Sequence, residues 1–188
     1  MTDPPGIAVR LATLRDIPRM QAIEIDAGRL FAEIGMQDVA DDGAHEAEVL
    51  AGYVGRCLAW VAERDGAVCA YALADVVDGA GHLEQVTVRP DHGRQGIGRL
   101  LIDVVADWAR AQGYTALTLM TFRDVPWNGP YYHRLGFEDV PEDELGPGLL
   151  QLRANEVAHG LDISIRSAMR RRLDVTSSEG SGAGPSAR

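Results

Sequence analysis

The feature that most constrains this chain is a strand, a glycine turn and a helix that follow one another within residues 86–101. Gly96 and Gly98 lie in the turn, where the missing side chains let a backbone approach a ligand closely. The free amide groups and the positive dipole end of a helix that begins there attract an anion. Arg94 and Arg99 flank these glycines and add positive charge. The segment therefore predicts a phosphate-binding site.

Two common phosphate-binding loops do not fit this segment. The third glycine of the dinucleotide fingerprint would fall at Leu101, which is too bulky for close packing of helix against strand. A Walker A loop needs a lysine for the phosphates, and all 18 basic residues of this chain are arginine. A third kind of phosphate turn is therefore expected. The all-arginine, Ala- and Gly-rich composition also indicates a bacterial coding sequence rich in G and C.

The rest of the composition is typical of a globular protein. The 188 residues are 46% apolar and 24% charged, which suits one domain with a sizeable core. We expect that domain to span residues 1–175, followed at 176–188 by a disordered tail rich in Ser, Gly and Ala. No apolar run approaches the roughly 20 residues of a membrane span, and the N-terminus lacks the pattern of a signal peptide. A cytoplasmic location is therefore predicted.

Charge, cysteines and histidines narrow the range of partners and cofactors. The net charge of −10 disfavours nucleic acid and anionic membranes, which bind dense positive charge, and it suits a cationic small molecule better. Cys57 and Cys69 lie in separate apolar segments, so we expect two buried free thiols. His45, His133 and His159 show no mutual spacing of metal ligands. No metal is expected.

Hydrophobic periodicity predicts an alternation of strands and helices. The pair Asp65-Gly66 between two apolar runs is typical of a hairpin turn. Apolar residues at helical spacing after the glycine turn predict an amphipathic helix that ends near Gly113. This order implies an α/β fold with a mixed sheet and parallel crossover units. The expected strands are 7–11, 57–63, 67–77, 82–89, 116–122 and 163–170, and the other expected helices are 17–27, one or two within 29–54, and 130–135.

The glycine turn resembles motif A of the GNAT superfamily of acetyl-CoA-dependent N-acetyltransferases. That motif reads Gln/Arg-x-x-Gly-x-Gly/Ala, and this chain reads Gly93-Arg94-Gln95-Gly96-Ile97-Gly98. The first position departs from the pattern, because Gly93 stands where Gln or Arg is usual. The neighbouring Arg94 and Gln95 can supply the missing hydrogen-bond donors.

A second block resembles the late helix-to-strand segment of the same family. It reads Asn128-Gly129-Pro130-Tyr131-Tyr132-His133-Arg134-Leu135-Gly136-Phe137, against Asn…Phe-Tyr-x-x-Leu-Gly-Phe in the family. Two blocks in the right order are specific, and the resemblance covers residues 8–171. It implies the GNAT fold, in which a mixed central β-sheet is flanked by helices and two parallel central strands splay apart to form the acetyl-CoA cleft. Residues 86–88 and 117–121 would belong to those strands.

The resemblance implies where acetyl-CoA, the expected cosubstrate, binds. The pantetheine arm would bond the open backbone of Val86, Thr87 and Val88. The family's pantetheine-binding Asn corresponds to Asn128, although Asn before Gly-Pro is also a normal turn and helix-cap residue. The pyrophosphate would be held at the turn, by Arg94, Gln95, Gly96, Ile97, Gly98 and Arg99.

The resemblance also implies direct acetyl transfer without a covalent enzyme intermediate. Tyr132 matches the tyrosine that commonly protonates the leaving thiolate, and its hydroxyl is a proton donor at neutral pH. Its alternative role is core packing, which is the role we expect for Tyr131. Glu84 is the expected base, which passes a proton to water, and a solvated surface carboxylate is the alternative. His82 lies on the same strand face, where we expect a surface residue.

The acceptor is expected to be a primary amine of a small molecule, bound by the variable early region. Acidic residues there would attract a cation, or they are the solvated faces of helices: Glu24, Asp26, Glu33, Asp38, Asp41 and Asp42. The alternatives are an acetyltransferase that acts on a peptide or protein amine and a non-catalytic acyl-CoA-binding or sensor module. The acidic charge disfavours an enzyme that acetylates aminoacyl-tRNA. A homodimer formed through the strand at 163–170 is a further hypothesis from the resemblance.

Overall fold

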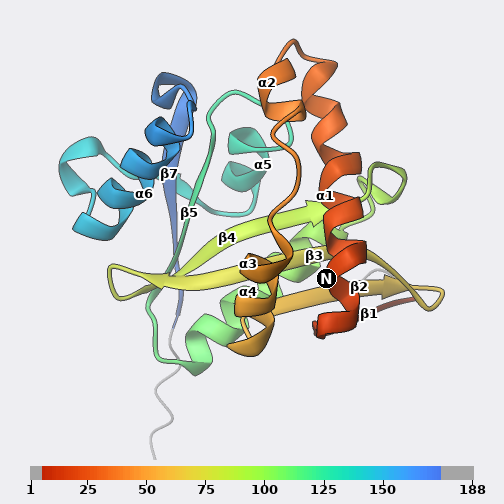
Figure 1. Ribbon diagram of the computed structural model, residues 1–188. Coiled ribbons are helices and arrows are strands. Elements are labelled where there is room, and N and C mark those ends of the chain that lie inside the picture. Colours follow the sequence, from red (N-terminus) through yellow and green to blue (C-terminus); the bar gives the residue numbers. More distant parts are fainter. Residues whose placement is uncertain (1–5, 175–188) are drawn as a thin grey trace, which may run out of the picture.

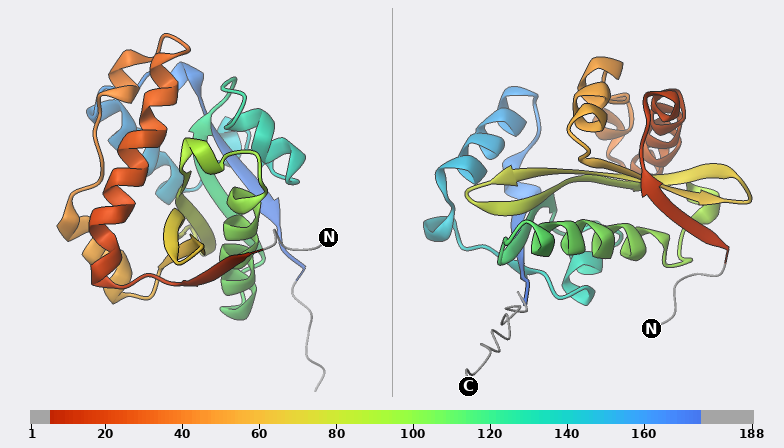
Figure 2. Two further views of the ribbon diagram at one scale, coloured as in Figure 1. Left: turned by 90° about the vertical axis from the view of Figure 1, so that its right-hand side faces the viewer. Right: turned by 90° about the horizontal axis from the view of Figure 1, so that it is seen from below.

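The computed structural model describes residues 6–174, which build one mixed β-sheet between two layers of helices (Figure 1). The sheet has seven strands in the order β1-β2-β3-β4-β5-β7-β6. β4 and β5 run parallel, and the other neighbouring strands are antiparallel. Helices α1 to α3 cover one face of the sheet and α4 covers the other (Figure 2). The predicted α/β fold with a mixed sheet is confirmed, and the expected tail at 176–188 lies outside the described residues.

The predicted strands and helices occur in the predicted order along the chain, and β6 and α6 are additional. The strands are β1 (Ile7–Leu11), β2 (Ala59–Arg64), β3 (Ala67–Val77), β4 (Ala80–Val88), β5 (Ala116–Phe122), β6 (Glu138–Asp139) and β7 (Arg166–Arg172). The helices are α1 (Ile17–Ala32), α2 (Gln37–Ala40), α3 (Ala47–Gly55), α4 (Ile97–Ala111), α5 (Gly129–Arg134) and α6 (Pro147–Ala158). Strands β1, β3 and β5 begin and end at the predicted residues.

Two Asp-Gly turns set the register of the central antiparallel strands. Asp65 and Gly66 link β2 to β3 with φ values of 52° and 78°, and Asp78 and Gly79 link β3 to β4 with φ values of 51° and 73°. Positive φ at both central residues is typical of a type I′ hairpin turn, which favours Asp-Gly. The first turn confirms the predicted hairpin. The second begins β4 at Ala80, ahead of its predicted start.

Apolar side chains fill the space on both faces of the sheet. The inner face of α4 is fully buried against the sheet at Leu101, Ile102 and Val105. On the opposite face, Met20 and Ile23 of α1 pack with residues of β2 and β3. Because α4 is fixed along its length by this core, the glycine turn at its N-terminus is held beside the end of β4.

Two elements differ in length from the sequence expectation. Helix α1 continues past residue 27 to Ala32, because Phe31 packs on the rings of Phe122 and Trp127 at centroid distances of 5.4 and 5.6 Å. Strand β7 begins at Arg166, since a 3₁₀ turn (Ile163–Ile165) precedes it. Both differences depend on tertiary contacts.

The expectation of two buried thiols holds for only one cysteine. Cys69 is buried on β3, and Cys57 is exposed; both are free thiols. Cys57 lies between α3 and β2 with a φ of 58°, so it belongs to a turn and not to the predicted strand. Its side chain therefore faces solvent where the apolar run predicted burial.

Helix α6 is the main element that the sequence does not reveal. It follows Gly146 and lacks a clear apolar stripe. The carboxylate of Asp78, at the tip of the β3–β4 hairpin, accepts hydrogen bonds from the amides of Gly148 and Leu149 at 2.7 and 3.0 Å. Glycine at residue 148 leaves room for this cap, because a Cβ there would lie 2.8 Å from Oδ1 of Asp78 and would displace it. A residue far away in the sequence therefore caps α6, and no local pattern shows this.

We expect Asp78→Ala to lower the free energy of unfolding by about 1–2 kcal/mol, because it removes both capping hydrogen bonds and places alanine at positive φ. Asp78→Asn is the matched control, since asparagine tolerates that backbone conformation and keeps one acceptor oxygen. Urea unfolding followed by circular dichroism measures both variants. An unchanged stability of Asp78→Ala would show that α6 does not depend on this cap.

Candidate active site

The two parallel strands separate beyond their first paired residues. β4 and β5 pair at Gly81 with Leu117 and at His82 with Thr118, and the pairing ends there. At residues 85–88, β4 bonds to β3 on one side, while β5 bonds to β7 on its far side. The facing edges therefore carry backbone N–H and C=O groups that are open to a ligand. This confirms the predicted splay.

Helix α4 begins beside the open end of β4 with a turn of left-handed backbone. Gly96 is the N-cap residue with a φ of 80°. Arg94 has a φ of 60°, a conformation that costs a residue with a side chain about 1–2 kcal/mol. Ile97 is buried in the core, so only its backbone can contact a ligand. The first-turn amides of α4 have no partner within the helix, and such a set of N–H donors suits a phosphate.

The polar side chains of the turn differ in their availability to a ligand. Gln95 accepts a hydrogen bond from Arg64 and donates to the backbone carbonyl of Asp91, in a 3₁₀ turn (Pro90–His92), at 3.4 Å. Nε of Arg99 lies 3.5 Å from Oδ2 of Asp103, one turn further along α4. Arg94 is exposed at the tip of the turn. The Gln95 side chain therefore holds the turn in place, while Arg94 and the amides face the space where an anion would lie.

Gly98 of α4 lies close to both β4 and α5. A Cβ at Gly98 would lie 3.2 Å from the Tyr131 hydroxyl and 3.5 Å from Cγ2 of Val88. Tyr131 therefore packs over this glycine, in agreement with its expected packing role. A larger side chain at residue 98 would fill the space between the turn and β4.

Asn128 lies at the N-terminus of α5, but its side chain does not cap that helix. Asn128 holds the N-cap position that the alternative expects, and its Nδ2 donates to Oγ1 of Thr121 on β5 at 3.1 Å in place of a side-chain cap. Its Oδ1 is buried and has no hydrogen-bond partner within residues 6–174. A buried acceptor without a partner costs about 1–3 kcal/mol. The site therefore fits a ligand that brings an N–H donor, and the amides of pantetheine are such donors.

Tyr132 lies on the same short helix and is buried. Its side chain is 8% exposed, and its ring lies 5.6 Å from the ring centroids of both Tyr131 and Phe137. Burial raises the pKa of the hydroxyl well above its usual value, and the charge of Arg166 opposes this shift. The hydroxyl therefore keeps its proton at neutral pH, as a proton donor must.

Glu84 lies at an irregularity of β4. Leu73 and Ala74 of β3 pair with Gln85 and Leu83, so Glu84 has no partner on β3 and forms a β-bulge. The side chain is 30% exposed. Burial raises the pKa of its carboxyl above the ordinary value. The residue is therefore a partly buried carboxylate at the splay, less exposed than a fully solvated surface group.

His82 is not the surface residue that the sequence suggests. It is 2% exposed, and its Nδ1 lies 2.8 Å from Oγ1 of Thr118 on β5. Because that hydroxyl donates to the carbonyl oxygen of Gly81, the imidazole donates through Nδ1. Burial lowers the pKa of His82 to about 4, so the ring is neutral at neutral pH. The hydrogen bond between His82 and Thr118 joins β4 to β5 at the point where the strands separate. Nε2 of His82 lies 3.8 Å from Oε2 of Glu84.

The family of the chain follows from a comparison with known protein families. Residues 25–137, more than half of the chain, match the acetyltransferase (GNAT) family. The chain belongs to the GNAT family. It is therefore an acyltransferase, and the glycine turn and the block at 128–137 both lie within the matched residues.

Solved structures of GNAT proteins have the same fold. N-acetylglutamate synthase from Neisseria gonorrhoeae, with coenzyme A and N-acetyl-glutamate, is 23% identical with a TM-score of 0.67 over 89% of this chain and 35% of that one. PaiA N-acetyltransferase from Thermoplasma acidophilum, with coenzyme A, is 13% identical (TM-score 0.68, 89% and 99% covered). The ribosomal-protein-S18-alanine N-acetyltransferase from Escherichia coli is 18% identical (TM-score 0.63, 92% and 97% covered). This GNAT chain thus spans about a third of the length of the synthase.

The fold of this GNAT protein brings together polar residues that no sequence pattern connects. Glu24 of α1 accepts hydrogen bonds from the Tyr71 hydroxyl at 2.8 Å and from the backbone amide of His45 at 3.1 Å. Nδ1 of His45 lies 2.7 Å from the other carboxylate oxygen, and Nε2 of Gln85 lies 3.5 Å from that same oxygen. α1, the segment before α3, β3 and β4 therefore meet at one carboxylate, next to Glu84 on β4.

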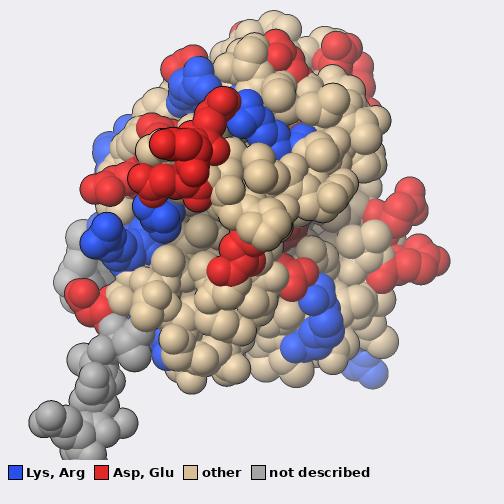
Figure 3. All heavy atoms as spheres, turned by 90° about the vertical axis from the view of Figure 1, so that its left-hand side faces the viewer, with Lys and Arg blue, Asp and Glu red and all other residues tan. Residues whose placement is uncertain are grey.

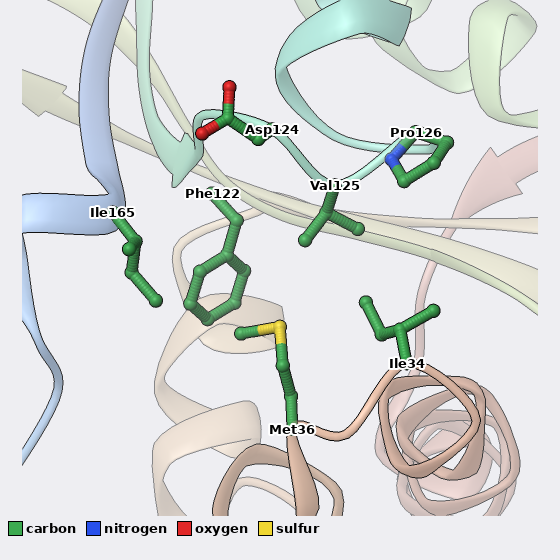
Figure 4. A pocket seen from close by; sticks show the side chains of 7 residues that line it. All are labelled: Ile34, Met36, Phe122, Asp124, Val125, Pro126 and Ile165. Atoms are coloured by element: carbon green, nitrogen blue, oxygen red, sulfur yellow. The ribbon is translucent and has the colours of Figure 1, made fainter.

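An apolar cavity of about 280 Å³ lies at the end of β5 (Figure 4). The side chain of Asp124 points away from the ring of Phe122, so the walls of the cavity are apolar. The guanidinium of Arg166 lies 4.4 Å from the centroid of the same ring and pairs with Glu156 of α6. The cavity is lined by Ile34, Met36, Phe122, Asp124, Val125, Pro126 and Ile165.

Charged side chains form separate groups on the surface. On the face shown in Figure 3, acidic side chains gather in patches, with arginines between them. Four of the acidic residues in the early region are exposed, as their solvated alternative predicts: Glu33, Asp38, Asp41 and Asp42. Within residues 6–174, no helix is long and apolar enough to cross a membrane, and no cluster of His, Cys, Asp and Glu is suited to a metal ion.

Proposed function

We propose that this GNAT protein transfers the acetyl group of acetyl-CoA to a primary amine of a small molecule, directly within a ternary complex. The observation that carries the proposal is the open edge of β4, which runs between the amide-lined turn of α4 and the unpartnered Oδ1 of Asn128. The amides of the turn can bind the pyrophosphate, and the open strand edge together with the Asn128 side chain can form hydrogen bonds with the pantetheine arm.

Backbone groups supply most of the proposed contacts with acetyl-CoA. Val86, Thr87 and Val88 hold the pantetheine arm through the β4 edge, because the Thr87 side chain is buried and bonded to Gln85. Oδ1 of Asn128 accepts a hydrogen bond from an amide of the pantetheine arm. The turn holds the pyrophosphate, with Arg94 and Arg99 adding charge to the amides of Gln95, Gly96, Ile97, Gly98 and Arg99.

The proposed chemistry needs a base for the amine and an acid for the leaving group. Acetyl transfer from a thioester forms a C–N bond and breaks a C–S bond, so the nitrogen loses a proton and the thiolate gains one. Glu84 takes the proton of the amine, and its raised pKa brings its basicity closer to neutral pH. Tyr132 protonates the thiolate. An amide of the β4 edge stabilises the oxyanion between these steps.

The surroundings of Glu84 support a small cationic acceptor. The charges of Asp75 and Glu156 act on Glu84, and the carboxylate of Glu24 lies on the same side of β4, so an ammonium group is attracted there. The charge of Arg166 also acts on Glu84, and its guanidinium lies over the Phe122 ring that lines the apolar cavity. An acceptor with an amine at Glu84 and an apolar group in the cavity satisfies both features.

Two measurements test the function. Calorimetric titration with acetyl-CoA measures binding, and release of free thiol is screened over primary amines, polyamines, aminoglycosides, amino acids and short peptides. We expect saturable binding and thiol release that depends on a small amine. Gly98→Val should raise the Kd of acetyl-CoA about 10- to 100-fold, because its side chain fills the space beside Val88 and Tyr131.

Gly52→Ala is the matched control for this variant, since its added Cβ on α3 has open space around it. Its Kd should equal that of the wild type. Binding without thiol release for any amine would favour the sensor module, and release with peptides alone would favour a protein acceptor. The absence of binding would contradict the proposal altogether.

A further inference from the structure

The Glu24–His45 pair is held more firmly than a surface ion pair. One carboxylate oxygen of Glu24 accepts hydrogen bonds from the hydroxyl of the fully buried Tyr71 and from the backbone amide of His45. The other oxygen accepts a hydrogen bond from Nδ1 of His45. The side chain of Glu24 is 13% exposed. Three hydrogen bonds from two elements fix this carboxylate, and the carboxylate in turn fixes the orientation of the imidazole.

This geometry sets which nitrogen of His45 can accept a proton. A carboxylate is an acceptor only, so Nδ1 at 2.7 Å from it must carry a proton. The lone pair of the neutral ring is therefore on Nε2. The His45 side chain is 28% exposed, which leaves the ring accessible from solvent. The arrangement is that of a histidine oriented by a carboxylate, as in enzymes that use histidine as a base.

His45 and Glu84 lie close enough to affect each other's protonation. The hydrogen bond that Nδ1 donates to Glu24 raises the pKa of His45 most, the charges of Glu24, Glu84 and Asp42 add to this, and burial opposes it. In return, the charge of His45 opposes the upward shift that burial causes in the pKa of Glu84. The geometry agrees with this proximity, because Nε2 of Gln85, the residue after Glu84 on β4, and Nδ1 of His45 lie 3.5 and 2.7 Å from the same carboxylate oxygen of Glu24.

We propose that His45, oriented by Glu24, receives the proton that Glu84 takes from the acceptor amine and passes it to solvent. This inference rests on the proposed function. In the first step the N–H bond of the amine breaks and an O–H bond forms on Glu84. In the second, that O–H bond breaks and an N–H bond forms at Nε2 of His45, with water carrying the proton between the two side chains; the ring then releases the proton to bulk water. Glu84 is the catalytic base, and His45 and Glu24 are positioning residues that act through it.

The pair predicts a specific dependence of turnover on pH. Protonated His45 cannot accept a proton, so kcat/KM should rise with pH through the raised pKa of His45. Glu24→Gln removes the charge and the acceptor that raise this pKa, so the acidic limb should move to lower pH. His45→Gln should remove the limb and lower turnover at neutral pH about 10-fold or more. Deprotonation of the acceptor amine gives its own limb in the pH profile of kcat/KM. Primary amines of different pKa distinguish the two limbs, since only the limb of the amine moves when the amine is changed.

A second readout does not require turnover. NMR titration of the full chain follows the His45 ring directly, with His45→Gln identifying its signals. Its titration midpoint should fall in Glu24→Gln. Tyr71→Phe is the structural control, because it removes one donor to Glu24 and leaves the contact between Glu24 and His45, so the acidic limb should remain. His159→Gln is the control for loss of a histidine, since His159 is exposed and its ring bonds only to the backbone carbonyl of Asn155 among the described residues.

The outcomes separate this inference from the proposed function. Thiol release with an acidic limb that moves in Glu24→Gln and vanishes in His45→Gln supports the proton path. Thiol release with a limb that neither variant moves overturns the path and leaves the acetyltransferase intact. A midpoint of His45 that is the same in Glu24→Gln and the wild type also overturns the path. Absence of thiol release from the wild type, with acetyl-CoA bound, overturns the proposed function and the path with it.

Discussion

Tyr132→Phe should lower turnover about 100-fold or more while acetyl-CoA binds with nearly unchanged affinity. The substitution removes only the hydroxyl, and the ring keeps its contacts with Tyr131 and Phe137. Because burial raises the pKa of Tyr132 well above its usual value, the wild-type hydroxyl holds a proton that it can give to the thiolate. Thiol release at saturating acetyl-CoA measures the loss, and calorimetry measures the affinity.

Tyr131→Phe is the matched control, because it removes a hydroxyl from the neighbouring residue of the same helix. That hydroxyl lies over Gly98 and not in the position of the family's tyrosine, so turnover should change little. Equal losses in the two variants would contradict the assignment of the acid to Tyr132. Full turnover in Tyr132→Phe would leave Tyr132 with the packing role that its contacts in the core also allow.

The parts of the site that were predictable are those made by neighbours in the sequence. The turn from Gly96 into α4 needs glycine for its backbone and an apolar stripe behind it, and both appear as local patterns. β4 and β5 were predictable as a parallel pair, because a helix links them. The proton path was not predictable. Glu24 and His45 are separated by 21 positions without a periodic relation, and only the packing of α1 over β3 and β4 brings them together.

Residues whose environment depends on packing were the ones most often predicted wrongly. His82 is polar and near the start of a strand, which is typical of a surface residue. It is nevertheless buried in the core, because its ring forms a hydrogen bond with Thr118 on the neighbouring strand. The cap of α6 comes from Asp78, 70 positions before Gly148. The bulge at Glu84 likewise leaves no mark in a single sequence, because it depends on how β3 and β4 pair. In each case the deciding partner is remote along the chain.

Gly129→Ala should destabilise the protein far more than Gly52→Ala or Gly55→Ala, although each substitution adds one methyl group. A Cβ at this residue would overlap the carbonyl oxygen of Arg123, and it would lie 2.9 Å from the carbonyl carbon of Arg123 and 3.1 Å from the carbonyl oxygen of Phe122. These are backbone atoms at the end of β5, so no side chain can rotate away to make room. We expect the free energy of unfolding to fall by about 3 kcal/mol, and Tm by roughly 6–12 °C.

The same substitution should also reduce turnover, because Gly129 fixes the distance between β5 and α5. If α5 moves away from β5, the bond between Asn128 and Thr121 lengthens and the Tyr132 hydroxyl moves with the helix. Gly55→Ala is the matched control, since a Cβ there has open space and should leave both stability and turnover close to wild type. Thermal unfolding and thiol release measured on the same preparations decide the matter. A stable but inactive Gly129→Ala would mean that the strand end yields instead of the helix, and a stable, active variant would show that α5 is not held by this contact.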